Sequence, residues 1–116
     1  MHFKLIIALV ENTESDAIMS AAREAGARGA TVLTGAQGEG LNPQRTFFGL
    51  SLESQRDMLM FIVEEHLSRQ VLERIAETGN FESKPGSGIA FKLDIEDAVG
   101  LNTQMHAIAP EIEDLS

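Results

Sequence analysis

Two glycine-containing segments carry the residues whose type and spacing could bind a small anion. The first, Gly35-Ala-Gln-Gly-Glu-Gly40, is followed by Arg45, and the second runs from 79 to 88 with Lys84 and Gly86 inside it. Glycine lets backbone N–H groups approach a ligand closely, and a nearby cation stabilises negative charge. Neither segment has the full G-x-x-x-x-G-K-[ST] spacing of a P-loop. Taken alone, the second is therefore more typical of a structural turn.

The first segment is also long, and it carries apolar side chains. From Gly35 to Ser54 roughly twenty residues show little periodicity, which is more than a hairpin connection requires. Phenylalanines on an exposed loop favour a binding role, and a hairpin folded against its own subunit is the alternative. We therefore predict a partner-binding surface at Phe47, Phe48 and Leu50.

Other kinds of chemistry find little support in the residue types. The chain has no cysteine and no tyrosine, which excludes disulfides, thiolate nucleophiles, cysteine metal sites and phenolic groups. The histidines, His2, His66 and His106, are far apart, which argues against a zinc site within one chain. A metal bridging subunits at His66 stays open as an alternative. Since no serine lies in a G-x-S-x-G setting and no catalytic triad stands out, we expect a protein that is not an enzyme.

Length and charge limit the function further. The 116 residues, 43% of them apolar, fit one globular domain and leave no room for a second catalytic domain. Eighteen acids against nine bases give a net charge of -9, which disfavours nucleic-acid or anionic-membrane binding. The first apolar run is too short for a signal peptide or a membrane span, so we expect a cytoplasmic location.

The hydrophobic pattern predicts the elements that must position these segments. Apolar runs predict four strands, at residues 3–10, 29–34, 57–63 and 89–95. A helix is expected after the first strand, capped by Asn12, Thr13 or Ser15 and stopped at Gly26. A second helix is expected over residues 66–78, with Gly79 as its stop.

The two halves of the chain share one register. An offset of 53 residues places Glu11 on Glu64 and Ile18 on Val71. Two such β-α-β units predict an α+β, ferredoxin-like β-α-β-β-α-β fold. Because the strands are apolar on both faces, the face away from the helices should pack against other subunits. We therefore predict a homo-oligomer and favour a homotrimer.

Several short motifs then occur in a characteristic order over roughly residues 3 to 101: Gly29-Ala-Thr-Val32, the long glycine-containing loop, Thr78-Gly79, Gly86-Ser-Gly88-Ile-Ala-Phe91 and Glu96-Asp-Ala-Val99. This order resembles the PII signal-transduction family. The resemblance implies trimers of ferredoxin-like subunits that bind adenine nucleotides between subunits and regulate transporters, enzymes or transcription factors through a T-loop. It implies a domain at residues 1–104, with the T-loop at about 37–54 and the B-loop at about 79–88. Residues 105–116 read as an acidic tail.

Carried over residue by residue, the resemblance implies an effector site on the T-loop base and the B-loop. The residues carried over as ligand-binding candidates are Thr31, Gly38, Gly40, Gly86 and Gly88. Arg45, Arg56 and Lys84 join them as cations in or beside the two loops that can supply phosphate contacts. The implied effectors are ATP, ADP, AMP or a cyclic dinucleotide, and no obligatory cofactor is implied. Ile89 stands where the family usually has a lysine, and Gly100 and Asn102 stand where it usually has an arginine pair. The usual cationic contacts to the phosphates are therefore missing.

The T-loop region has no tyrosine, which excludes control by nucleotidylation. Its Thr46-Phe-Phe-Gly-Leu-Ser-Leu stretch looks like a divergent, transporter-associated PII-like branch. The expected function is a non-enzymatic regulator whose small effector changes binding to a partner such as a membrane transporter or a regulated enzyme. A CutA-like metal-binding or metal-tolerance trimer is the main alternative, and a small enzyme with a cleft between subunits is the third.

Overall fold

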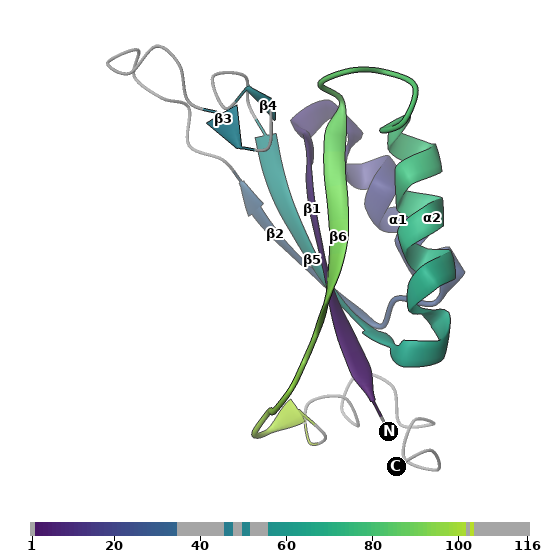
Figure 1. The fold of residues 1–116 in the computed structure, drawn as a ribbon, viewed down its shortest axis with the longest axis vertical. Coiled ribbons are helices and arrows are strands. Elements are labelled where there is room, and N and C mark those ends of the chain that lie inside the picture. The colour runs from purple at the N-terminus through teal and green to yellow at the C-terminus, as the bar shows by residue number, and fades with distance from the viewer. Residues whose placement is uncertain (1, 35–45, 48–49, 52–55, 102, 104–116) are drawn as a thin grey trace.

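The computed structural model describes residues 2–34, 46–47, 50–51, 56–101 and 103 (Figure 1). The elements in chain order are β1 (Phe3–Glu11), α1 (Ser15–Ala25), β2 (Gly29–Thr34), β3 (Thr46–Phe47), β4 (Leu50–Ser51), β5 (Arg56–Glu64), α2 (Ser68–Gly79) and β6 (Gly88–Asp94). A short 3-10 turn precedes each helix, η1 (Asn12–Glu14) and η2 (Glu65–Leu67). The predicted α+β, β-α-β-β-α-β order is confirmed, with the small β3–β4 hairpin added between β2 and β5.

The main sheet has the strand order β2-β5-β1-β6, and every neighbouring pair is antiparallel. Both helices cover the same face of this sheet, as Figure 1 shows. Alternate residues of the two central strands point to that face and are almost completely buried, together with residues of both helices: Ile6, Ala8, Val10, Leu59, Phe61, Val63, Ile18, Ala22, Val71 and Ile75. The period-two pattern of apolar residues therefore builds the core directly.

The other sheet face carries the out-of-phase apolar residues. In the pairing register Ile7 lies opposite Met60 on one side and Phe91 on the other. These side chains are only partly buried, as are Leu5 and Ile62. At one end of this face, a smaller cluster forms around buried Phe3. As expected, the two helices cover one face of the sheet and leave the apolar side chains of the other face partly exposed within the described residues.

The 53-residue repeat is preserved in three dimensions, because α1 begins at Ser15 and α2 at Ser68, each after a three-residue 3-10 turn. The predicted caps were wrong. Asn12 and Thr13 belong to the turn, and the residues at the two N-cap positions, Glu14 and Leu67, make no side-chain cap hydrogen bond. Ser15 is the first residue of its helix, and its hydroxyl bonds to a distant strand instead of to its own helix.

The predicted C-terminal end is correct for α1 but not for α2. Gly26 ends α1 with φ 124°, as predicted. Gly79 was expected to end the second helix, but it is the last helical residue, and Asn80 follows in the left-handed region with φ 57° and ψ 38°. The expected helix start at His66 was also wrong, since His66 belongs to η2. Among the described residues, no helix combines the length and apolar character needed to cross a membrane.

Candidate functional site

The connection between α2 and β6, residues 80–87, arches over one end of the sheet, at the top of Figure 1. Backbone hydrogen bonds hold it together: the N–H of Lys84 donates to the Asn80 carbonyl at 3.0 Å, and the N–H of Ser87 donates to the Lys84 carbonyl at 3.1 Å. The Ser87 hydroxyl, in a residue only 4% exposed, donates to the Asn80 carbonyl at 3.1 Å. The loop is therefore a compact turn built on its own backbone.

An aromatic ring explains the two glycines that flank the loop. A Cβ atom placed on Gly79 would lie 2.2 Å from Cε1 of Phe81, and one placed on Gly88 would lie 2.4 Å from the same atom and 2.7 Å from the Leu9 carbonyl oxygen. Any side chain at either position would overlap the ring. Gly86 differs, because a Cβ there meets nothing within 4 Å, but its φ of 82° favours glycine.

The first two residues of β5 bind this end of the sheet together. Nη2 of Arg56 donates to the Gly86 carbonyl at 2.7 Å, and Oδ2 of Asp57 accepts from the Ser15 hydroxyl at 2.5 Å. Both charged residues are buried, with exposed fractions of 8% and 7%. Arg56 thus connects β5 to the B-loop, and Asp57 connects it to the start of α1.

The structure brings together only part of the predicted site. Arg56 contacts the B-loop at Gly86, and Lys84 lies exposed in the same loop. Gly88 begins β6. Thr31 is exposed on β2, which β5 and β1 separate from β6, so three strand spacings of roughly 4.8 Å divide it from β6 within one chain.

The T-loop candidates are mostly outside the described residues. Gly38, Gly40, Arg45 and Phe48 all fall there. Phe47 and Leu50 form a backbone pair in the β3–β4 ladder. The predicted partner surface at these positions stays a prediction.

A groove of about 500 Å³ runs beside the B-loop, between α2 and β6. Its lining combines apolar residues with three charged ones: Leu72, Ala76, Phe81, Ile89 and Ala90, and Arg69, Glu73 and Glu82. Nε of Arg69 donates to Oε2 of Glu73 at 3.0 Å, one helical turn apart. Gly86 and Gly88 also line the groove, so it is continuous with the candidate site.

The chain and its fold agree with a known family. Residues 3–105 match the family model described as nitrogen regulatory protein P-II. The chain belongs to the P-II family. It is similar to a putative PII-like signaling protein from Thermus thermophilus, at 25% identity over 88% of this chain and 95% of that one, with a TM-score of 0.59.

Two structures of CPII, a PII-like protein from Thiomonas intermedia K12, are also similar. The structure bound to ADP, AMP and acetate is 22% identical over 86% of this chain and 92% of that chain, with a TM-score of 0.62. The structure bound to ADP, AMP and bicarbonate is 21% identical over 85% and 96%, with a TM-score of 0.61. A search of curated protein sequences gave no match. The predicted P-II resemblance is confirmed, and the family is one of signalling proteins.

Sequence reasoning missed three residues at this end of the sheet: Phe81 and Ser87, which shape the loop, and Asp57, which binds the start of α1. Of these three residues, only Asp57 could have been recognised from the sequence pattern. It shares the alternation of Leu59 and Phe61, which face the helices, so a buried carboxylate could have been expected. Phe81 and Ser87 gave none, because their roles depend on contacts made only after folding.

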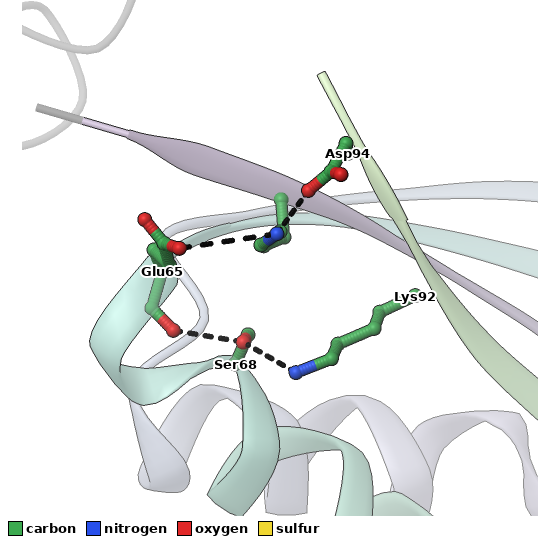
Figure 2. Close-up of polar contacts among 5 residues, drawn as sticks. Glu65, Ser68, Lys92 and Asp94 are labelled. Carbon is green, nitrogen blue, oxygen red and sulfur yellow. Dashed lines mark hydrogen bonds and ion pairs between the residues drawn. The ribbon is translucent and has the colours of Figure 1, made fainter. Parts of the chain in front are cut away.

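A second polar cluster of this P-II protein lies at the opposite end of the sheet, around the start of α2 (Figure 2). Nζ of Lys92 donates to the Ser68 hydroxyl at 3.2 Å, and that hydroxyl donates to the Glu65 carbonyl at 2.8 Å. Nζ of Lys4 bonds to Oδ1 of Asp94 and lies 4.0 Å from Oε1 of Glu65. The hydrogen bond and charge of Lys4 lower the pKa of Asp94, and the same contact raises the pKa of Lys4.

His66, the candidate for a bridging metal, contacts a carboxylate of its own chain. Nε2 of His66 lies 3.5 Å from Oε2 of buried Glu64, whose Oε1 lies 3.6 Å from Nε of Arg28. Across the described part of the chain, no group of three or more histidine, aspartate or glutamate side chains could hold a metal ion.

Proposed function

We propose that this P-II protein is a non-enzymatic regulator that binds an adenine nucleotide at the B-loop, in clefts between the subunits of a homotrimer. The bound nucleotide changes how the T-loop, residues 37–54, contacts a partner protein such as a membrane transporter. The observation that carries the proposal is the B-loop itself, a fixed glycine-containing turn with an exposed lysine on it.

The B-loop suits an anion for two reasons. Lys84 is exposed, and Gly86 leaves open space where a side chain would stand, so an anion can approach both the ammonium group and the backbone. The loop is also held by internal hydrogen bonds, which reduces the entropy lost on binding. CPII, the PII-like protein with the same fold, binds ADP and AMP, which supports an adenine nucleotide here.

In a homotrimer, the sheet face opposite the two helices would pack against neighbouring subunits. The side chains of Leu5, Ile7, Met60 and Ile62 are partly exposed on that face, and Leu93 on β6 is 43% exposed. Apolar surface of this extent along a whole sheet face is typical of a subunit interface. Thr31 on β2 would then join the nucleotide site from a neighbouring subunit, since it is distant from β6 within its own chain.

The effector we favour is ADP or AMP. Ile89, Gly100 and Asn102 occupy positions where the family usually has cations, so Lys84 and Arg45 are left to balance the phosphates. Each missing charge-assisted hydrogen bond removes roughly 1.5–3 kcal/mol. Affinity should therefore rise little from AMP to ATP.

Isothermal titration with ATP, ADP, AMP and a cyclic dinucleotide tests the proposal, with the subunit number measured by sedimentation. Lys84→Met should weaken ADP about tenfold, in line with the loss of one charged hydrogen bond. Lys92→Met is the matched control, because Lys92 lies at the other end of the sheet and should leave the affinity unchanged. A trimer that binds none of these nucleotides would contradict the nucleotide site.

A further inference from the structure

Arg56 occupies an unusual place for a cation beside an anion-binding loop. The residue is only 8% exposed, and its Nη2 points to the carbonyl of Gly86 at 2.7 Å. In the register it lies opposite Glu11 at the end of β1. This hydrogen bond satisfies the Nη2 group of a buried guanidinium, and it ties the arginine side chain to the backbone of the loop.

The peptide unit between Gly86 and Ser87 is held at both of its polar atoms. Its carbonyl accepts from Arg56, and its N–H donates to the Lys84 carbonyl at 3.1 Å. The Ser87 hydroxyl adds a third attachment, to the carbonyl of Asn80. The side of Gly86 where a Cβ would stand is open, whereas its carbonyl is occupied by the arginine.

The residue that follows Arg56 anchors the same end of β5. Asp57 accepts a hydrogen bond from Ser15 at the start of α1, and it is 7% exposed. The beginning of β5 is therefore attached to α1 through Asp57 and to the B-loop through Arg56. A shift of Arg56 would require the neighbouring buried pair to move as well.

We propose that Arg56 is a positioning residue: it fixes the B-loop backbone at Gly86 and raises effector affinity through the loop, while Lys84 supplies the charge that faces the effector. This inference rests on the proposed nucleotide site. Arg56 therefore acts before any ligand arrives, and its effect is present in the free protein.

The test compares Arg56→Met with Lys84→Met in the full-length protein, using two measurements. The first is the hydrogen-exchange rate of the Ser87 amide without nucleotide, and the second is ADP affinity at low and high salt. Salt screens an exposed cation far more than a buried hydrogen bond. Arg56→Met should raise the Ser87 exchange rate about tenfold and weaken ADP about tenfold, by the same factor at both salt concentrations. Lys84→Met should leave the exchange rate unchanged, and its effect on ADP should shrink as salt rises.

Two results would overturn the inference: an unchanged Ser87 exchange rate in Arg56→Met, or a loss of ADP affinity that shrinks with salt as it does for Lys84→Met. If Arg56→Met does not fold, Arg56→Lys takes its place, because it keeps a donor near Gly86 and should give a smaller rise in exchange. If the wild type binds no nucleotide, the proposed site fails, but the exchange rates still show whether Arg56 holds the loop.

Discussion

The two β-α-β halves of the molecule follow the same path but differ in how each helix reaches its second strand. In the first half three residues, 26–28, lead from α1 to β2. In the second half eight residues, 80–87, lead from α2 to β6. The N–H of Ala27 returns at once to the Ala22 carbonyl at 2.9 Å, whereas the longer connection forms its own network of turns.

The short connection shows that the fold itself needs only about three residues at this point, in line with usual connections between helices and strands. The additional residues of the second half therefore need another reason, and they include Lys84, Gly86 and Ser87. The connection in the second half is longer than the fold requires, and this connection holds the candidate site. Variants that affect one half and spare the other test this comparison.

The largest effect is expected at Gly88, where the B-loop enters the sheet. Gly88→Ala would place a Cβ 2.4 Å from the Phe81 ring and 2.7 Å from the Leu9 carbonyl oxygen. Because the backbone of β1 cannot move away freely, we expect a loss of about 2–3 kcal/mol in the free energy of unfolding. Urea denaturation measures it.

The control for this variant is Gly86→Ala in the same loop. There a Cβ has open space, and only the φ of 82° opposes it, so the expected loss is about 1 kcal/mol. Equal losses at the two positions would show that the Phe81 ring does not set the shape of the second half.

An intermediate effect is expected from the two matched serines that begin the helices. Ser15→Ala removes the donor to the buried Asp57 carboxylate and should cost about 1.5–2 kcal/mol. Ser68→Ala removes a bond to the Glu65 carbonyl and an acceptor for exposed Lys92, and should cost about 1 kcal/mol. Thermal unfolding of both variants gives the difference.

A double variant sharpens this pair. Ser15→Ala with Asp57→Leu replaces both polar partners by apolar groups, so it should recover part of the stability that Ser15→Ala loses. If the double variant is less stable than Ser15→Ala alone, Asp57 contributes through contacts other than the Ser15 hydroxyl.

The smallest effect is expected at Asp94, at the far end of the second half. Lys4 lowers the pKa of Asp94 in the folded state, so this contact stabilises the protein above the ordinary aspartate range, near pH 3.8. The stabilisation is lost as the pH falls through the lowered value, while Lys4, whose pKa is raised, stays charged. Asp94→Asn should therefore lower Tm slightly at pH 7, and the difference should shrink as the pH falls below the ordinary aspartate range. A difference in Tm that stays constant as the pH is lowered would contradict this assignment.

The fold could be predicted because its core depends on local periodicity. The alternation of Ile6, Ala8 and Val10 survives unchanged in the buried face of β1. The motif order also identified the family over nearly the whole chain. These features are properties of neighbouring residues, which a sequence displays directly.

The site depends on distant contacts, and here the sequence was less informative. Ser15 looks like a helix cap, but its hydroxyl bonds to Asp57, 42 residues away. Gly79 looks like a helix stop, but it is glycine because the Phe81 ring lies against it. Arg56 and Gly86 are 30 residues apart and meet only after β5 and the B-loop are in place.

The length of β1 has a practical consequence for measurements on this protein. The strand runs from Phe3, next to exposed His2, to Glu11, which lies opposite Arg56. Eight steps of about 3.4 Å separate these two ends by roughly 27 Å. A fluorophore or a surface anchor attached at His2 would therefore leave the B-loop unobstructed, and the molecule can be immobilised through that end for ligand titrations.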